Sequence, residues 1–346
     1  MANTTSSRLG ASLGATAPFD HADNQELMLK VFSGEVLEVF DRKQVLKDLV
    51  KTRRLTGAKE AQFPIIGTAS AGYHAPGQDI SASTGNGGLM QEIQHAEKIV
   101  KVDYPLVAPV FISEWDEALN HYEVRSEYAH QLGQALANKW DKLLFRVFDA
   151  AGSGSASVPG TYAGHTITNS DATGYSTADF LAHIFEAKQK MDERDVPMEG
   201  RVLCVPPAWE IALIKDDAAN KLIDRDYSID NGSYARAVIG RVAGFTLITS
   251  NNMPFEDSGE EPGAESGQLN GSYQGDTAIK MEALAFHPDA VGQVTLWDME
   301  VQTQYSALHQ GTFVMSRLAC GADVLRNECA IPIVSTAASK NVPGPN

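Results

Sequence analysis

The sequence predicts an α+β fold, in which helices and strands follow one another in mixed order. Three observations predict it: one unusually long amphipathic helical pattern near the middle of the chain, several short runs with the alternation typical of strands, and the absence of a repeated strand–helix–strand series. With 346 residues, the chain is long enough for two or three domains.

Composition and charge exclude several classes of function. The net charge of −16 argues against general affinity for nucleic acid, which requires a basic surface. The chain has no apolar run long enough to span a membrane, and residues 1–17 do not resemble a signal peptide, so we expect a cytoplasmic site of synthesis. Cys204, Cys320 and Cys329 are odd in number and lack a CxxC spacing, so we interpret them as buried thiols.

The long helix is predicted over residues 113–149. Ser113 is a suitable N-cap, and at a rise of ~1.5 Å per residue the helix would span roughly 54 Å. Trp115 and Tyr122 lie seven residues apart on one face, which predicts packing in the core rather than a platform for stacking bases. The apolar residues recur at steps of three and four: Trp115, Ala118, Leu119, Tyr122, Ala129, Leu132, Ala135, Leu136, Trp140, Leu143, Leu144 and Val147.

The region before this helix is interpreted as two extensions. Residues 24–50 have a helical pattern ahead of any evident core, which is typical of an arm. Residues 42–54 carry six basic side chains against Asp48 alone, and indicate a solvated helix face or a basic arm on a neighbour's acidic surface, with contact to nucleic acid or an accessory protein as the alternative.

A protruding β-arm is predicted between this basic segment and the long helix. Strand-like residues 62–67 and 99–104 enclose the polar, glycine-rich residues 77–88. Because an isolated hairpin buries little surface, we expect this arm to need a partner surface, such as another copy of the chain.

The region after the long helix alternates helices and strands without a regular order. A loop over residues 255–276 is acidic and contains no Lys or Arg. The predicted helices are 177–194 and 208–215, with a pattern that allows the second to continue to 222. The predicted strands are 201–205, 239–250, 283–286, 294–297, 310–320 and 330–334.

No catalytic signature is found. The nine histidines contain no HExxH spacing, no GxSxG occurs, and neither Cys204 nor Cys320 has a His or Asn nearby in sequence. We therefore assign no catalytic, cofactor-binding or metal-binding residue and expect no cofactor. The arm, the β-protrusion and the long helix all imply contacts with other chains, so the pattern alone favours a self-assembling structural protein over an enzyme.

Several blocks of sequence resemble one known family. Residues 29–37 (LKVFSGEVL) resemble its N-terminal arm. Residues 61–67 (AQFPIIG) and 73–77 (YHAPG) resemble its extended loop. The family is that of major capsid proteins from short-tailed phages of the T-seven group, podoviruses of the Autographiviridae type. The strongest match is residues 118–128 (ALNHYEVRSEY), continued by 131–133. The resemblance implies the Hong Kong 97 phage capsid fold.

The resemblance also implies a division of the chain into named parts. These are an N-terminal arm (1–52), an extended β-loop or E-loop (53–110), a peripheral domain (111–178 and 280–335) whose spine helix covers about 113–150, an axial domain (179–279) and a C-terminal tail (336–346).

The function that the resemblance implies is that of a structural major capsid protein. Such a protein self-assembles into hexamers and pentamers of an icosahedral shell around double-stranded DNA, bound without sequence specificity. A separate scaffolding protein acts during assembly, which takes place in the host bacterial cytoplasm, and a portal protein occupies one vertex of the virion. An encapsulin-type cargo shell protein and a soluble enzyme with an unrecognised site stay open as alternatives.

The candidate inter-subunit contact residues come from the arm, the basic segment, the β-loop and the matching helix block. Arg125 and Tyr128 are included because they lie outside the main apolar stripe of the helix. The full set is Leu29, Val31, Phe32, Arg42, Lys47, Arg53, Phe63, Tyr73, Gln78, Asp79, Arg125 and Tyr128.

Overall fold

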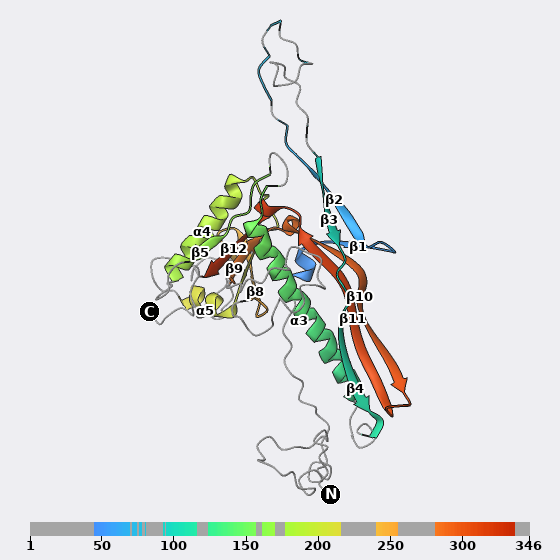
Figure 1. Cartoon of the computed structure of the whole chain (residues 1–346). Coiled ribbons are helices and arrows are strands. Elements are labelled where there is room, and N and C mark those ends of the chain that lie inside the picture. The colour runs from blue at the N-terminus through green and yellow to red at the C-terminus, as the bar shows by residue number, and fades with distance from the viewer. Residues whose placement is uncertain are drawn as a thin grey trace. The chain divides into compact units, whose positions relative to one another are not determined.

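The computed structural model describes most of the chain between residues 45 and 335 (Figure 1). The described residues are 45–69, 71–74, 76–77, 80, 93, 95–115, 124–156, 161–169, 177–215, 240–254 and 281–335, with the backbone alone for 124–127 and 215. The predicted arm up to residue 44, the tip of the β-loop, the acidic loop 255–276, the extension of a helix to 222 and the tail 336–346 lie outside them.

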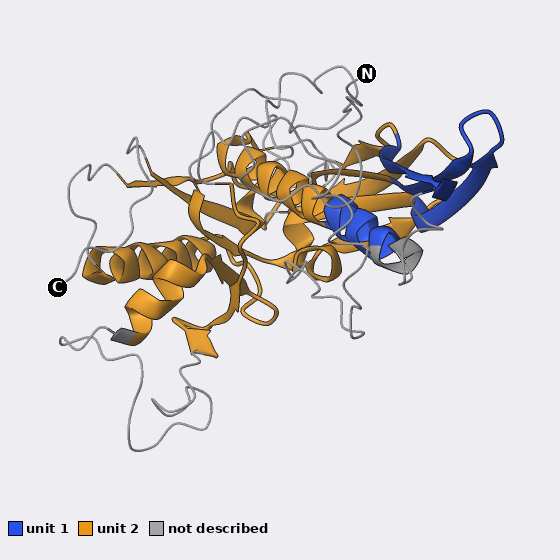
Figure 2. Cartoon of the chain, turned by 90° about the horizontal axis from the view of Figure 1, so that it is seen from below, with its two compact units in different colours: residues 1–42, 105–137, 297–318 blue, residues 43–104, 138–296, 319–346 orange. Residues whose placement is uncertain are grey.

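The chain divides into two compact units (Figure 2). Unit 1 comprises residues 1–42, 105–137 and 297–318, and unit 2 comprises residues 43–104, 138–296 and 319–346. Three long elements continue from one unit into the other along the chain: α3 (Val124–Ser153), β10 (Val291–Ser306) and β11 (Gly311–Val324). The division into arm, loop, peripheral and axial domains stays a prediction.

A six-stranded mixed sheet forms the core of unit 2. Its order is β5 (Ile167–Asn169), β12 (Ala330–Ser335), β9 (Met281–Phe286), β6 (Val202–Val205), β8 (Phe245–Thr249) and β7 (Arg241–Val242). Every residue of β6 and β9 is buried, so both faces of the central strands are covered. The aromatic ring of Phe148 on α3 lies 4.6 Å from that of Phe286, which places the second half of α3 on this sheet.

Two further helices are described in unit 2, and both were predicted. In α4 (Thr177–Glu193), buried residues recur at helical spacing, and Phe180 stacks on Trp209 of α5 (Pro207–Lys215) at 4.4 Å. The chain leaves α4 through Asp195, which has a positive φ of 55°. The buried guanidinium of Arg201 fixes this turn, because it donates to the Val196 and Pro197 carbonyls and pairs with Asp192 at 2.7 Å.

The long helix is confirmed over residues 124–149, and α3 continues to Ser153. Ser113 is the last residue of strand β4 (Leu106–Ser113), Glu114 and Trp115 are helical, and residues 116–123 lie outside the described part. The prediction that Trp115 packs in the core is wrong, because its side chain is 67% exposed. Trp115 lies two residues after the end of β4. Tyr122 is not described.

The second sheet has four strands in the order β1 (Lys51–Arg54), β10, β11 and β4. Strand β1 runs parallel to β10 at residues 292–295, whereas β4 pairs antiparallel with β11 from Leu106↔Leu318 to Ser113↔Gly311. Strands β10 and β11 are longer than predicted, with 16 and 14 residues. The second half of β10 was missed although residues 297–306 (WDMEVQTQYS) alternate apolar and polar side chains, which is typical of a strand; most of these side chains are exposed in the subunit.

The predicted β-arm is confirmed as the antiparallel pair β2 (Glu60–Ile66) and β3 (His95–Lys101), hereafter the hairpin. Its register runs from Glu60↔Lys101 to Ile66↔His95, so the second strand begins four residues earlier than predicted. The hairpin packs on the four-stranded sheet through one apolar cluster. The buried members of that cluster are Ala61, Val100, Val102, Val294, Ala319 and Leu325.

Two other predictions need correction. Residues 51–54 form strand β1 rather than a helix face, because the backbone pairs with β10 and only residues 47–49 form a 3-10 helix, η1. The single strand predicted over 239–250 is two short strands, β7 and β8, since Ala243 and Gly244 turn the chain back with φ of 51° and 88°. Two successive positive φ values are typical of a tight hairpin turn.

Gly321 allows the hairpin to lie directly on β11. A Cβ atom at this position would lie 1.9 Å from the carbonyl oxygen of Lys101, and the backbone N–H of Asp103 donates to the carbonyl of Cys320 at 3.1 Å. Backbone therefore meets backbone here, with no side chain that can move aside.

We predict that Gly321→Ala destabilises the unassembled subunit by about 2 kcal/mol or more, because the backbone of β3 must shift. Gly133→Ala is the matched control, since its Cβ would meet only Met299 Sδ at 3.5 Å, an ordinary contact. As Gly133 lies inside a helix, we expect stabilisation of ~0.5–1 kcal/mol. Urea unfolding measures both effects, and equal stability of Gly321→Ala and the parent would contradict the described packing.

Candidate assembly surfaces

The described residues do not form a metal centre. Among them, no group of three or more His, Cys, Asp or Glu side chains could hold a metal ion. The three cysteines are buried as predicted, and burial raises the pKa of Cys204 and, to about 12, that of Cys329, so neither is a ready nucleophile. No helix in the described part of the chain is long and apolar enough to cross a membrane.

The first candidate surface is the outward face of the strands in unit 1, which we call the outer face. Alternate residues of β4 and β11 point to opposite sides of the sheet. Ile112, Val314 and Leu318 are buried on one side, whereas Phe111 and Phe313 form an exposed cross-strand pair on the other. The rings of Phe111 and Phe313 lie 4.9 Å apart.

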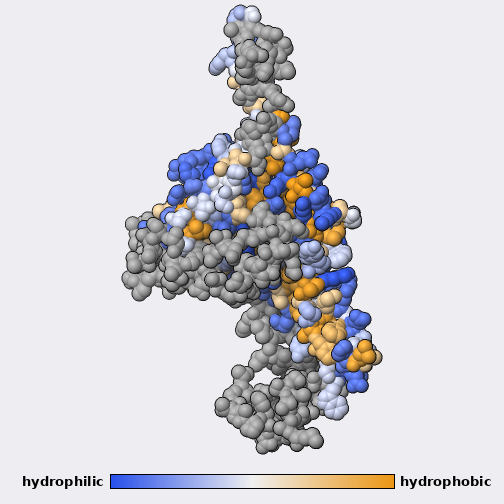
Figure 3. Space-filling view, viewed as in Figure 1, coloured by the Kyte–Doolittle hydropathy of each residue, from blue (hydrophilic) through white to orange (hydrophobic). Residues whose placement is uncertain are grey.

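Few charges interrupt the outer face near the turn between β10 and β11. Residues 301–313 contain no Asp, Glu, Lys or Arg, and Leu308 in the turn is 93% exposed. The imidazole of His309 lies edge-on to both phenylalanine rings. Farther along, Arg317 is neutralised by Glu300 at 2.8 Å and lies over the Trp297 ring. Figure 3 shows apolar residues gathered over these strands, at the lower right.

The second candidate surface is the exposed side of the hairpin in unit 2. Ile66 and Ile99 are exposed there, and Tyr73, which follows β2, is fully exposed. The opposite side carries the apolar cluster that packs on the four-stranded sheet. The hairpin thus has one side held by its own subunit and one side available to another molecule.

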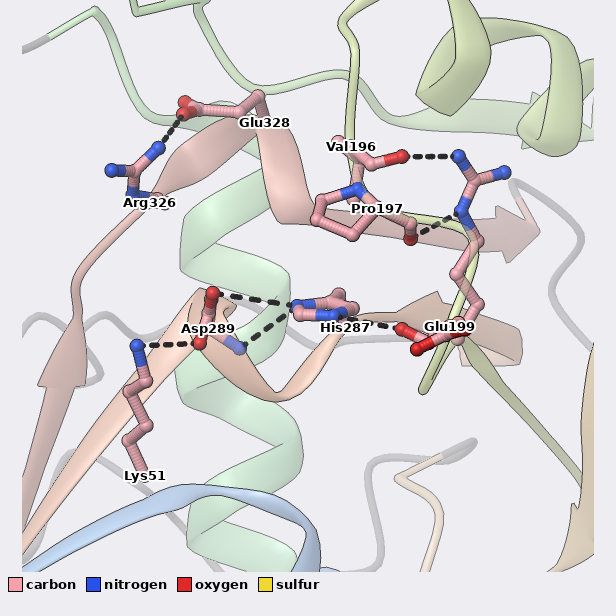
Figure 4. A network of polar contacts seen from close by, with 9 residues as sticks. Lys51, Val196, Pro197, Glu199, His287, Asp289, Arg326 and Glu328 are labelled. Atoms are coloured by element: carbon pink, nitrogen blue, oxygen red, sulfur yellow. Dashed lines mark hydrogen bonds and ion pairs between the residues drawn. The ribbon is translucent and has the colours of Figure 1, made fainter.

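A polar network in unit 2 ties β1 to the six-stranded sheet (Figure 4). Lys51 pairs with Asp289 at 2.6 Å. The backbone N–H of Asp289 donates to His287 Nδ1, and His287 Nε2 lies 3.1 Å from the carbonyl oxygen of Glu199. The two ring nitrogens of His287 thus link Asp289 to the turn that carries Glu199. These contacts are internal, and they hold in place the strand from which the hairpin departs.

A second internal contact fixes the point at which the N-terminal segment meets unit 2. The carboxylate of Asp141, fully buried on α3, accepts from the Leu46 N–H at 3.0 Å and from Asn252 Nδ2 at 3.1 Å. Leu46 is the N-cap residue of η1 and supplies no side-chain cap, and its own backbone N–H is satisfied by Asp141 from a distant position. The pKa of Asp141 is raised, because burial has the largest effect on it. The hydrogen bonds that the carboxylate accepts lower the pKa, but by less.

The predicted contact residues fall into three groups. Lys47, Arg53, Phe63, Tyr73 and Tyr128 are described, and the side chains of Arg53 and Phe63 meet each other, with the guanidinium 4.8 Å from the ring centre. The backbone of Arg125 belongs to α3, but its side chain is not described. Leu29, Val31, Phe32, Arg42, Gln78 and Asp79 lie outside the described residues. Their roles between subunits stay predictions.

Sequence reasoning missed the outer face. Phe111, Leu308 and Phe313 were not among the predicted contacts, and the strands that carry them were predicted only in part. A signal was present for strand β10, because residues 297–306 alternate apolar and polar side chains, which is typical of a strand.

The chain is similar to major capsid proteins along most of its length. Residues 62–334 match the family described as Gp10A-like: Major capsid protein. The major capsid protein of Escherichia phage T7 is 29% identical over 337 residues, covering 90% of this chain and 92% of that protein. The major capsid protein of Enterobacteria phage T3 is 27% identical over 336 residues, with coverage of 90% and 92%.

Solved capsid structures have the same fold. The capsid of cyanophage P-SCSP1u matches with a TM-score of 0.74 and 31% identity, covering 97% of this chain and all of that one. The mature capsid of bacteriophage PhiM1 matches with a TM-score of 0.68 and 17% identity, covering 91% and 93%. The fold is therefore that of phage capsid proteins of the Hong Kong 97 type, as the sequence resemblance implied.

The fold and the family match together define the class as a shell-forming structural subunit of a phage virion. The chain belongs to the Gp10A-like family of major capsid proteins. Its function is structural and not enzymatic: it oligomerises into the capsomers of an icosahedral capsid.

We predict that the stability difference between the parent and Asp141→Asn depends on pH. Since the folded pKa of Asp141 lies above its ordinary value of 3.8, the folded chain binds the proton more tightly than the unfolded chain. The stabilisation that the protonated Asp141 contributes is fully present below pH 3.8 and is lost as pH rises through the pKa of the folded state. The loss amounts to about 1.4 kcal/mol for each unit by which the folded pKa exceeds the unfolded pKa. Asn does not titrate, so the parent should lose stability relative to the variant.

Urea unfolding of both proteins between about pH 3.5 and about pH 7 tests this. A difference between parent and variant that is constant over this range would contradict the described burial of an ionisable Asp141.

Proposed function

We propose that the chain forms hexamers and pentamers that close an icosahedral shell around double-stranded DNA, and that the outer face of unit 1 is one of the surfaces through which copies meet. The observation that carries this proposal is the exposed, nearly uncharged aromatic patch around Phe111, Leu308 and Phe313. Soluble monomers rarely expose large contiguous apolar patches, which mark interaction sites.

The charge of the chain makes this patch suitable for contact between identical copies. Each copy carries a net charge of −16, so copies repel one another over most of their surface. A charge that is buried unpaired in a contact between copies also loses its hydration. A surface without Asp, Glu, Lys or Arg avoids this repulsion and gains the burial of its aromatic side chains.

The hairpin supplies a second contact in the proposal, by lying over a neighbouring subunit. Its exposed side, with Ile66, Tyr73 and Ile99, is available for that contact. The N-terminal arm (1–52), including Leu29, Val31, Phe32 and Arg42, docks along another neighbour. Each contact is weak alone, but every subunit repeats it, so the closed shell is stable through multivalency.

The other partners are those that the family resemblance implies. A separate scaffolding protein guides assembly in the host bacterial cytoplasm, and a portal protein occupies one vertex. The packaged DNA is enclosed without sequence-specific contacts, and the negative charge of the chain keeps the wall from adhering to it. The family match favours this function over an encapsulin-type cargo shell or a soluble enzyme. Nucleic acid in purified particles is the measurement that separates a phage capsid from a cargo shell.

We predict that Leu308→Asp blocks assembly without unfolding the subunit. Because Leu308 is 93% exposed, its replacement costs the isolated subunit less than about 0.5 kcal/mol, whereas a carboxylate at a contact between copies is buried there without a partner. Met198→Asp is the matched control, at an apolar residue 63% exposed on a different surface, and should assemble normally. Sedimentation velocity and electron microscopy give the readout. Equal assembly of both variants would refute the role of the outer face.

We also predict that deletion of residues 77–88 leaves a folded subunit that fails to assemble. Among these residues, the structure describes only Gly77 and Ile80, both outside the strands that pack on the four-stranded sheet, so the apolar cluster should survive. Circular dichroism and thermal unfolding check the fold, and electron microscopy checks the shells. Normal shells from the deletion variant would contradict a role of the extended loop in assembly.

A further inference from the structure

The hairpin is attached to β11 at two separate points within unit 2. The first is the backbone contact at Gly321, where Lys101 passes over the strand and Asp103 N–H donates to Cys320. The second is an ion pair between Lys98 Nζ and Asp323 Oδ2, at 3.3 Å. Lys98 lies three residues from Lys101 along β3, about 10 Å in an extended strand.

The two points have different mechanical consequences. A single backbone contact fixes where β3 crosses β11, but it leaves the angle of crossing to weaker contacts. A second contact about 10 Å along the same strand fixes that angle, because two points define a line. The other strand of the hairpin has its own attachment, since Arg53 Nη1 donates to the Gln62 carbonyl at 2.8 Å and its guanidinium lies over Phe63, the residue paired with Lys98.

The ion pair is placed to act in this way. Asp323 is held in orientation, because its Oδ1 accepts from the N–H of Val324 at 2.8 Å while Oδ2 points to Lys98. The Asp323 side chain is 14% exposed and that of Lys98 is 35% exposed. Solvent and salt therefore screen this pair less than a pair at the open surface. The apolar cluster below it resists separation of the hairpin from the sheet, but it has no directional bonds of its own.

We propose that the ion pair between Lys98 and Asp323 sets the angle at which the hairpin leaves the four-stranded sheet, and so the position of its far end at Ile66 and His95. The consequence for assembly rests on the proposed contact between the hairpin and a neighbouring copy. Without the pair, the hairpin samples a range of directions, and copies join at varied angles.

The direction of the hairpin is measured in the unassembled subunit by electron–electron double resonance. Spin labels are attached to Ile66→Cys at the end of β2 and to Ile211→Cys on α5, both at exposed positions of unit 2. The three native cysteines are buried and do not compete for the label. Asp323→Asn keeps the shape and the Oδ1 acceptor but removes the charge, and we expect the distance distribution to broaden about twofold.

Two further variants separate the angle from general stability. The exchange Lys98→Asp with Asp323→Lys restores the pair in reverse and should restore the narrow distribution. Lys190→Gln is the control, because it removes an ion pair whose lysine has a similar exposure, 32%, with Glu193 at 2.8 Å on α4, away from the hairpin. It should leave the distribution unchanged.

Assembly is then tested by supplying each variant to a phage that lacks its own capsid gene and measuring particle diameters by electron microscopy. A broadened distance distribution in Asp323→Asn together with a wider spread of diameters supports the proposal. Broadened distances with normal shells support the assignment of the angle and contradict the hairpin contact between copies. An unchanged distance distribution in Asp323→Asn overturns the proposal.

Discussion

The packing of β3 on β11 at Gly321 is the contact on which the functional surfaces of unit 2 depend. Because a glycine stands there, the backbone of Lys101 reaches β11 directly, and Ala61, Val100 and Val102 reach Val294 and Ala319. A two-stranded hairpin is marginally stable alone. Here the apolar cluster holds one side of it, and its other side is free to meet a second molecule. A larger residue at position 321 would separate the two layers and leave the hairpin unsupported.

Charge is the second constraint on this subunit. A net charge of −16 favours solubility and opposes association of identical copies. Contacts that must form many times in one shell therefore favour surfaces where charge is absent or already paired. The outer face has both properties, since residues 301–313 carry no charged side chain and Arg317 is already paired with Glu300. Its aromatic residues then provide the apolar area that association requires.

Much of the fold was predictable because its elements have strong local patterns. The second half of the long helix, α4, β6 and the β2–β3 pair all carry regular spacing of apolar residues, and family blocks in the sequence identified the capsid fold. The hairpin of β7 and β8 was missed because Ala243, an uncommon residue at positive φ, occupies the turn. Trp115 was misplaced because a helical pattern does not tell whether a second layer covers it. The tertiary cap from Asp141 to Leu46 joins residues 95 positions apart, and no local pattern records it.

The most direct test is a cryo-electron microscopy reconstruction of particles assembled from this chain. The account predicts a closed icosahedral shell in which the exposed side of each hairpin contacts a neighbouring subunit, and in which Phe111, Leu308 and Phe313 are buried against other copies. A shell in which the hairpin contacts its own subunit alone and these three side chains remain exposed to solvent would contradict it.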